Sequence, residues 1–122
     1  MEQKGILEWI LISECQIPSD VNKLLVKGEE AIAAYKTFRD IAIFTNKRLI
    51  VRDSQGITGK KKDFTSIPYS KITTFSLETA GTFDLDAELE IYLAGVGKVK
   101  FEFTGSTDVK QICKMISQFA LA

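Results

Sequence analysis

The chain has 122 residues, of which 45% are hydrophobic and 26% charged, and this length and composition are typical of one folded domain and exclude a disordered chain. Lysine and arginine balance aspartate and glutamate at 16 each, which argues against a protein that binds nucleic acid by neutralising phosphates. The chain contains no histidine, so catalysis, metal binding and pH switching through imidazole are all excluded.

The cysteines and the hydropathy pattern predict a cytoplasmic protein. Cys15 and Cys113 lie far apart without a C-x-x-C partner, as expected for packed thiols in a reducing compartment, with a disulfide as the minor alternative. No apolar run reaches the roughly 18 residues of a membrane span. Gly5–Ile12 lacks the basic region and the cleavage site of a signal peptide.

Residues 1–28 are expected to form a helical N-terminal segment that precedes a domain over residues 29–122. Ile6–Ile12 is apolar almost throughout, so a helix there needs a partner to cover it. Pro18–Asp20 is expected to cap a second short helix, which Gly28 ends.

From Glu29 onward the pattern changes to that of strands, rich in β-branched and aromatic residues. Short polar turns separate the first of them, which predicts antiparallel neighbours. The seven expected strands are Glu29–Phe38, Asp40–Thr45, Arg48–Asp53, Lys61–Ser66, Ile72–Glu78, Ala87–Ala94 and Lys98–Thr104.

The last two strands alternate apolar and charged residues, so their pairing can be predicted. A three-residue loop within Ala94–Gly97 places the apolar sets on one face and sets Glu90 opposite Lys100, which avoids pairing Glu90 with Glu102.

A C-terminal helix follows, with an apolar stripe at 3.6-residue spacing. Its members are Val109, Ile112, Cys113, Ile116, Phe119 and Ala120. The predicted fold is mainly β: a bent seven-stranded antiparallel sheet, or partly open barrel, closed at one end by this helix.

Several segments, in this order and spacing, resemble the bacterial pleckstrin-homology domain family: Arg39–Asp40, Thr45–Ile50, Asp53–Lys61, Ser66–Tyr69 and Glu78–Leu89. The resemblance implies seven strands and a C-terminal helix, in agreement with the pattern of the residues. It also implies assembly into closed cyclic homo-oligomers, in particular pentameric rings, with a hydrophilic surface where strands of adjacent protomers meet.

The apolar N-terminus fits such a ring, because Ile6, Trp9 and Ile10 are easier to bury between protomers than on a small monomer. The alternative is a helix packed on its own barrel.

An acidic stretch is the first candidate binding surface. Asp84, Asp86, Glu88 and Glu90 are spaced by two, so they line one face if the segment is extended. A straight strand spreads its carboxylates too widely for a metal site, and no cleft marks a carboxylate pair for hydrolysis. A protein-binding surface is therefore predicted around Thr79, Thr82, Asp84, Asp86 and Glu88.

Lys60, Lys61 and Lys62 are the second candidate, a site for anionic lipid headgroups at the inner membrane surface. Eukaryotic pleckstrin-homology domains bind phosphoinositides through a basic loop between their first two strands, which is reduced here to Arg39–Asp40. Gly56–Lys61 departs from the phosphate-binding loop pattern, so a nucleotide site is not expected.

The sequence thus predicts a non-enzymatic interaction or scaffold module without a cofactor, whose partners are itself and another protein. Binding of anionic lipid is the alternative.

Overall fold

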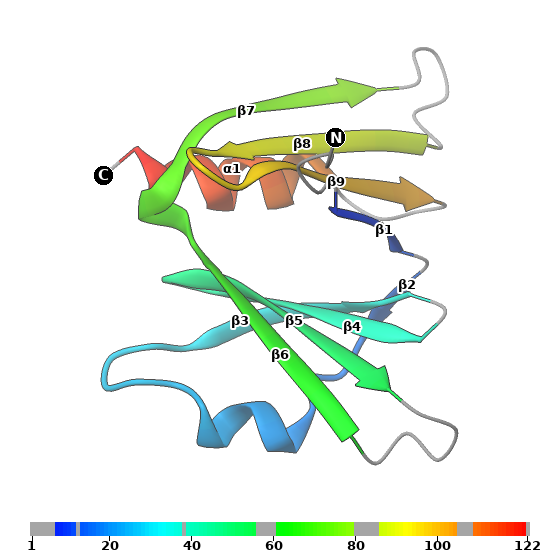
Figure 1. The fold of residues 1–122 in the computed structure, drawn as a ribbon, viewed down its shortest axis with the longest axis vertical. Helices are drawn as coiled ribbons and strands as arrows, with labels where there is room; N and C mark the ends of the chain where they lie inside the picture. The colour runs from blue at the N-terminus through cyan, green and yellow to red at the C-terminus, as the bar shows by residue number, and fades with distance from the viewer. Residues whose placement is uncertain are drawn as a thin grey trace.

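The computed structural model describes residues 7–11, 13–37, 39–55, 61–79, 86–104 and 109–121, which form two sheets that face each other with a helix packed against them (Figure 1). The elements of the first sheet are β2 (Ser13–Cys15), β3 (Ala31–Lys36), β4 (Asp40–Thr45), β5 (Arg48–Gln55) and β6 (Lys61–Pro68). Those of the second are β1 (Leu7–Leu11), β7 (Ile72–Thr79), β8 (Asp86–Leu93) and β9 (Gly97–Thr104). Two 3-10 turns, η1 (Ser19–Lys23) and η2 (Tyr69–Lys71), and helix α1 (Val109–Ala120) complete it.

The five-stranded sheet has the order β2-β3-β4-β5-β6 and is antiparallel throughout. It follows the predicted short turns: Asn46 and Lys47 alone separate β4 from β5. β4 is buried along most of its length because both faces of the sheet are covered. The fold and the seven strands implied by the sequence are confirmed.

The four-stranded sheet has the order β1-β9-β8-β7. Its β8–β9 hairpin has the predicted three-residue loop, with Gly95 at φ 80° and Gly97 at φ 121°, values that favour glycine. Glu90 lies opposite Lys100 as predicted, but the same register sets Glu88 opposite Glu102. This register avoids the pair of Glu90 with Glu102 but creates a like-charge pair of Glu88 with Glu102.

Most of the core lies between the two sheets. Buried residues from both pack together, and Tyr35 meets Phe44 and Phe103 edge to face at 5.8 and 6.3 Å between ring centroids. Helix α1 contributes Ile112 and Ile116 as predicted. It also buries Met115, which the sequence analysis did not place in the stripe.

The prediction of helix at the start of the chain was wrong for residues 7–11 and 13–15, which are strands. β1 pairs in parallel with β9, and β2 pairs antiparallel with β3, so the two short strands join different sheets. An apolar run of this length gains more from pairing its backbone with a sheet edge than from a short helix with no covered face. Further along, a 3-10 turn rather than an α-helix forms at Ser19–Lys23.

A buried ion pair fastens the loop after η1 to the β4–β5 turn. The Glu29 side chain is fully shielded, and its Oε2 accepts hydrogen bonds from Arg48 Nε at 2.9 Å and Thr45 Oγ1 at 2.7 Å. Its Oε1 accepts from Arg48 Nη2 and from the Val26 amide, both at 3.0 Å. We call this group, Glu29 with Arg48 and Thr45, the Glu29 clamp.

A second ion pair holds η1 itself against the outer face of the five-stranded sheet. Arg52 Nη1 donates to both carboxylate oxygens of Asp20, at 3.1 and 3.0 Å, and Lys62 Nζ donates to Oδ2 at 3.3 Å. Val21, on the same turn, packs into a small apolar cluster with Ala34, Ile43 and Ile50. The five-stranded sheet is thus covered on the face that points away from the main core.

Replacing Arg48 should make the folded chain less stable, because the shielded Glu29 carboxylate then loses its counter-ion. We expect Arg48→Ala to lower the free energy of unfolding by about 3 kcal/mol in chemical denaturation. Lys47→Ala is the matched control, since the neighbouring Lys47 is exposed, and should change it by less than about 0.5 kcal/mol. Equal effects of the two substitutions would contradict the role of the clamp.

Stability should also fall at acid pH. Burial raises the pKa of Glu29 and of Asp20, but their hydrogen bonds and ion pairs outweigh it and hold each pKa below its ordinary value of 4.5 or 3.8. A lowered folded pKa means that the unfolded chain binds more protons, so this stability is complete above pH 4.5 and is lost as the pH falls through the folded pKa values. Unfolding curves across this range measure it.

The double variant Asp20→Asn with Glu29→Gln should lose less of its remaining stability over that acid range than the wild type does. Parallel pH profiles would show that the two carboxylates do not carry the dependence.

Candidate functional site

A row of carboxylates crosses the outer face of the four-stranded sheet. Glu88 on β8 lies opposite Glu78 on β7 and opposite Glu102 on β9. Their neighbours along the strands, such as Leu89 and Phe101, are buried on the other face, so the alternation of the strands directs the glutamates outward. Residues directly opposite in a sheet lie about 5 Å apart at Cβ, and like charges there repel. We call Glu78, Glu88 and Glu102 the acidic row.

Lysines of β9 relieve part of this repulsion by reaching diagonally. Lys100 Nζ lies 3.6 Å from Glu88 Oε2, and Lys98 Nζ lies 3.6 Å from Glu90 Oε2. The Tyr92 hydroxyl donates to Glu90 Oε1 at 3.1 Å, and Lys98 Nζ sits 5.8 Å from the centre of the Tyr92 ring. The face is therefore a polar lattice of half-exposed charges, suited to contact with another polar surface.

The predicted acidic surface is present in part. Glu88 is described in full; Thr79 ends β7 and Asp86 begins β8, at one end of the same sheet, although their side chains lie outside the described part. Thr82 and Asp84 lie outside the described residues. Glu78 and Glu102 were not predicted as part of the surface, because only the strand register brings them beside Glu88.

The predicted lipid-binding lysines are not equivalent. Lys61 is exposed at the start of β6, Lys62 is paired with Asp20, and Lys60 lies outside the described residues.

The predicted oligomer contacts at the N-terminus are described only at the backbone. Trp9 lies opposite Phe101, and Ile10 lies opposite Glu102, in the parallel pair of β1 and β9. Their side chains, and all of Ile6, lie outside the described part of the chain.

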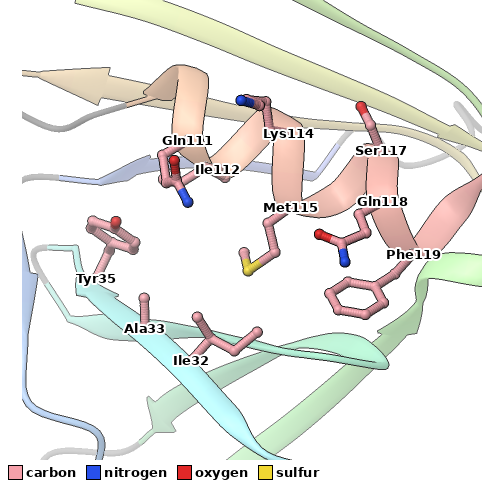
Figure 2. A pocket seen from close by; sticks show the side chains of 10 residues that line it. All are labelled: Ile32, Ala33, Tyr35, Gln111, Ile112, Lys114, Met115, Ser117, Gln118 and Phe119. Carbon is pink, nitrogen blue, oxygen red and sulfur yellow. The ribbon is translucent and has the colours of Figure 1, made fainter.

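A groove of about 620 Å³ runs between β3 and helix α1 (Figure 2). Its apolar lining includes Ile32, Met115 and Phe119, and the amides of Gln111 and Gln118 provide polar groups from the helix. Ile32 is 48% exposed, so this strand presents a large aliphatic side chain to the groove and to solvent. A bulge between Ala31 and Ala33 explains why the alternation of β3 did not reveal it.

A second groove, of about 390 Å³, lies between β6 and the β8–β9 hairpin. It is lined mainly by apolar groups, including Ile67, Pro68 and Val96, with Lys71 beside them. Sequence reasoning missed both grooves, because each joins segments that are distant in the chain.

Acidic side chains and thiols are the groups of the described residues that could bind a metal ion or react. Within the described residues no cluster of three or more cysteine, aspartate or glutamate side chains could hold a metal ion, and both cysteines are free thiols, as expected. Burial raises the pKa of Cys15, so its reactive thiolate is disfavoured. Among the described residues, no helix is long and apolar enough to cross a membrane.

Comparison with known proteins agrees with the fold. The Bacillus subtilis (strain 168) protein YjqA, itself uncharacterized, is 44% identical over 108 residues, which cover 87% of this chain and 86% of YjqA. A crystal structure of a protein with a pleckstrin-homology domain from Shewanella loihica PV-4 has a TM-score of 0.78 and 41% identity, covering 88% of this chain and 96% of that one.

A second crystal structure, of a pleckstrin-homology domain from Shewanella amazonensis SB2B, has a TM-score of 0.65 and 46% identity, with 85% of each chain covered. The sequence profile of the bacterial PH domain matches residues 1–120. This chain therefore belongs to the bacterial pleckstrin-homology domain family.

Proposed function

We propose that the chain is a non-catalytic interaction module that assembles into a cyclic homo-oligomer, a pentameric ring, and presents a repeated polar surface to a protein partner. The observation that carries the proposal is the pair of outer strands. β6 and β7 each lie at the border of a sheet and have one strand neighbour among the described strands. Their outward backbone groups are a template for pairing with another chain.

The arrangement of these strands supplies a contact of the kind from which a ring is built. β6 leads into β7 through η2, so both borders lie along one continuous stretch of chain (Figure 1). The opposite border of the four-stranded sheet is occupied by β1. A contact between β6 or β7 and a different surface of the next protomer is heterologous, and such contacts close into rings when the rotation allows it.

The acidic row and the adjoining Thr79, Thr82, Asp84 and Asp86 are the surface proposed to meet the partner. Lys100 neutralises Glu88, and Lys98 neutralises Glu90. Glu78 is exposed and is not part of these two ion pairs. Such a surface suits a basic or mixed-charge partner, and its repetition around a ring adds weak contacts through avidity.

Two expectations from the sequence stay predictions. The parallel pairing of β1 with β9 supports packing of the N-terminus within its own protomer, while a role for Ile6, Trp9 and Ile10 between protomers is untested. Headgroup binding at Lys60, Lys61 and Lys62 has less support, because Asp20 already pairs with Lys62.

Charge placed on the outer strands should dissociate the oligomer. We expect light scattering coupled to size-exclusion chromatography to give the mass of a pentamer for the wild type and of a monomer for Thr65→Lys with Thr74→Lys, exposed positions on β6 and β7. Asn22→Lys, exposed on η1, should keep the oligomer. A monomeric wild type would contradict the ring, and a variant that stays assembled would place the contact elsewhere.

Removing the carboxylates should weaken partner binding without dissociating the ring. We expect Asp84→Asn, Asp86→Asn and Glu88→Gln together to reduce recovery of the partner in quantitative pull-downs by about tenfold or more. Glu30→Gln, an exposed carboxylate at the other end of the molecule, is the control. Unchanged recovery with the triple variant would reject this surface while leaving the assembly intact.

A further inference from the structure

One end of the fold gathers exposed apolar side chains that the core does not use. Leu24 is 40% exposed and Val26 57% exposed, on the loop between η1 and β3. Val96, at 50%, is at the tip of the β8–β9 hairpin. In Figure 1 this loop, the β4–β5 turn, η2 and the hairpin all lie on the left side. Single exposed apolar residues are ordinary, but their collection at loop tips on one side calls for a reason.

The same end carries four lysines. Lys23 and Lys27 flank the exposed loop, Lys47 is on the β4–β5 turn and Lys71 is on η2. All four are exposed, and none of them forms an ion pair with another residue in the described part of the chain. We call Lys23, Leu24, Val26, Lys27, Lys47 and Lys71 the basic-apolar end.

Acidic residues at this end are few. Glu29 is shielded and neutralised by Arg48. The described residues from Lys23 to Lys47 contain two other carboxylates. Glu30 is exposed at this end, and Asp40 lies at the far end of β4. At the opposite end of the five-stranded sheet the strand register aligns three aspartates, Asp40, Asp53 and Asp63. The chain has no net charge, yet the four lysines of the basic-apolar end lie away from the end of the sheet at which these three aspartates align.

Hydrogen bonds hold the apolar loop in its exposed position. Arg48 Nη2 donates to the Leu24 carbonyl at 2.7 Å, and the Val26 amide donates to Glu29 Oε1 at 3.0 Å. Asn46 Nδ2 donates to the Gly28 carbonyl at 3.1 Å, which ties the loop to the turn that carries Lys47. Leu25, between the two exposed residues, packs inward instead. Leu24 and Val26 are thus presented outward by a fixed backbone.

The geometry points to an anionic phospholipid bilayer as the occupant of the basic-apolar end. Leu24 and Val26 would enter the boundary between headgroups and acyl chains, while Lys23, Lys27, Lys47 and Lys71 meet the lipid phosphates. Apolar tips interleaved with lysines on separate loops match this layered environment, in which apolar and anionic groups lie at different depths. A protein partner would more commonly be met by a continuous apolar centre with a polar rim.

This inference does not depend on the proposed ring or on a protein partner, and it differs from headgroup binding at Lys60, Lys61 and Lys62. Those lysines adjoin the end of β5 and the start of β6, at the other end of the sheet. A ring would only multiply the contacts with a bilayer.

The test is cosedimentation of the full chain with vesicles of phosphatidylcholine containing about one-third phosphatidylglycerol, compared with phosphatidylcholine alone. We expect binding to the anionic vesicles only, and its loss when salt rises from about 0.1 M to about 0.5 M. Each lysine near the surface contributes about fivefold, so Lys27→Ala with Lys47→Ala should lower the partition coefficient about 25-fold. Leu24→Ser with Val26→Ser should lower it about tenfold.

Lys36→Ala with Lys110→Ala is the matched control, since it removes two exposed lysines that lie outside both the basic-apolar end and the Lys60–Lys62 segment, and it should change binding by less than about twofold. Circular dichroism verifies that each variant is folded. No binding of the wild type to anionic vesicles overturns the inference. So does a loss with the control pair as large as that with Lys27→Ala and Lys47→Ala, which would show that binding follows total charge and not this end of the molecule.

The oligomeric mass of the variants separates a bilayer from a protein contact. If Leu24→Ser with Val26→Ser dissociates an oligomer and leaves vesicle binding unchanged, this end is an interface between copies of the chain, and the inference fails.

Discussion

The Glu29 clamp is the interaction on which the arrangement of this molecule depends. One shielded carboxylate gathers donors from the Arg48 side chain, the Thr45 hydroxyl and the Val26 amide, and so fixes the loop before β3 to the turn between β4 and β5. Tyr69 adds to it, since its hydroxyl donates to the Thr45 carbonyl at 2.8 Å and its ring stacks on Phe119 of α1. Burial, and then the Glu29 charge, raise the pKa of Tyr69, so its hydroxyl stays protonated as a donor.

These contacts connect parts of the fold that do not share a sheet. The loop from Leu24 to Glu30, the β4–β5 turn, η2 and the C-terminal helix meet through the backbone and side chains of a few residues, and they lie at one end of the sandwich. The end with the proposed bilayer contact is therefore tied together by these hydrogen bonds and by the aromatic ring contact. The acidic row is on a different surface, the outer face of the four-stranded sheet, so the two proposed contacts do not compete for the same side chains.

Much of the fold could be predicted from the sequence because its strands alternate and its turns are short. The alternation in β8 and β9 determined their faces, the loop and the register. β1 could not be predicted, since a short run that is apolar at all but one position has no clear period, and its pairing partner is near the other end of the chain. The same limit applied to the site: Glu88 was identified from its spacing, but Glu78 and Glu102 become its neighbours only through strand pairing, and the exposure of Leu24 and Val26 depends on a clamp formed by Glu29 and Arg48.

The parallel pairing of β1 with β9 also affects the order in which the chain can fold. Leu7 pairs with Val99 and Leu11 with Phe103, so the partners are about ninety residues apart, the kind of contact whose loop-closure entropy slows folding. During synthesis the first strand leaves the ribosome long before its partner exists. Until β9 is made and pairs with it, β1 is an apolar strand without its final neighbour, and contacts with other chains must be avoided during that time. The pairing of β1 therefore has to wait until one of the last strands of the domain has been made.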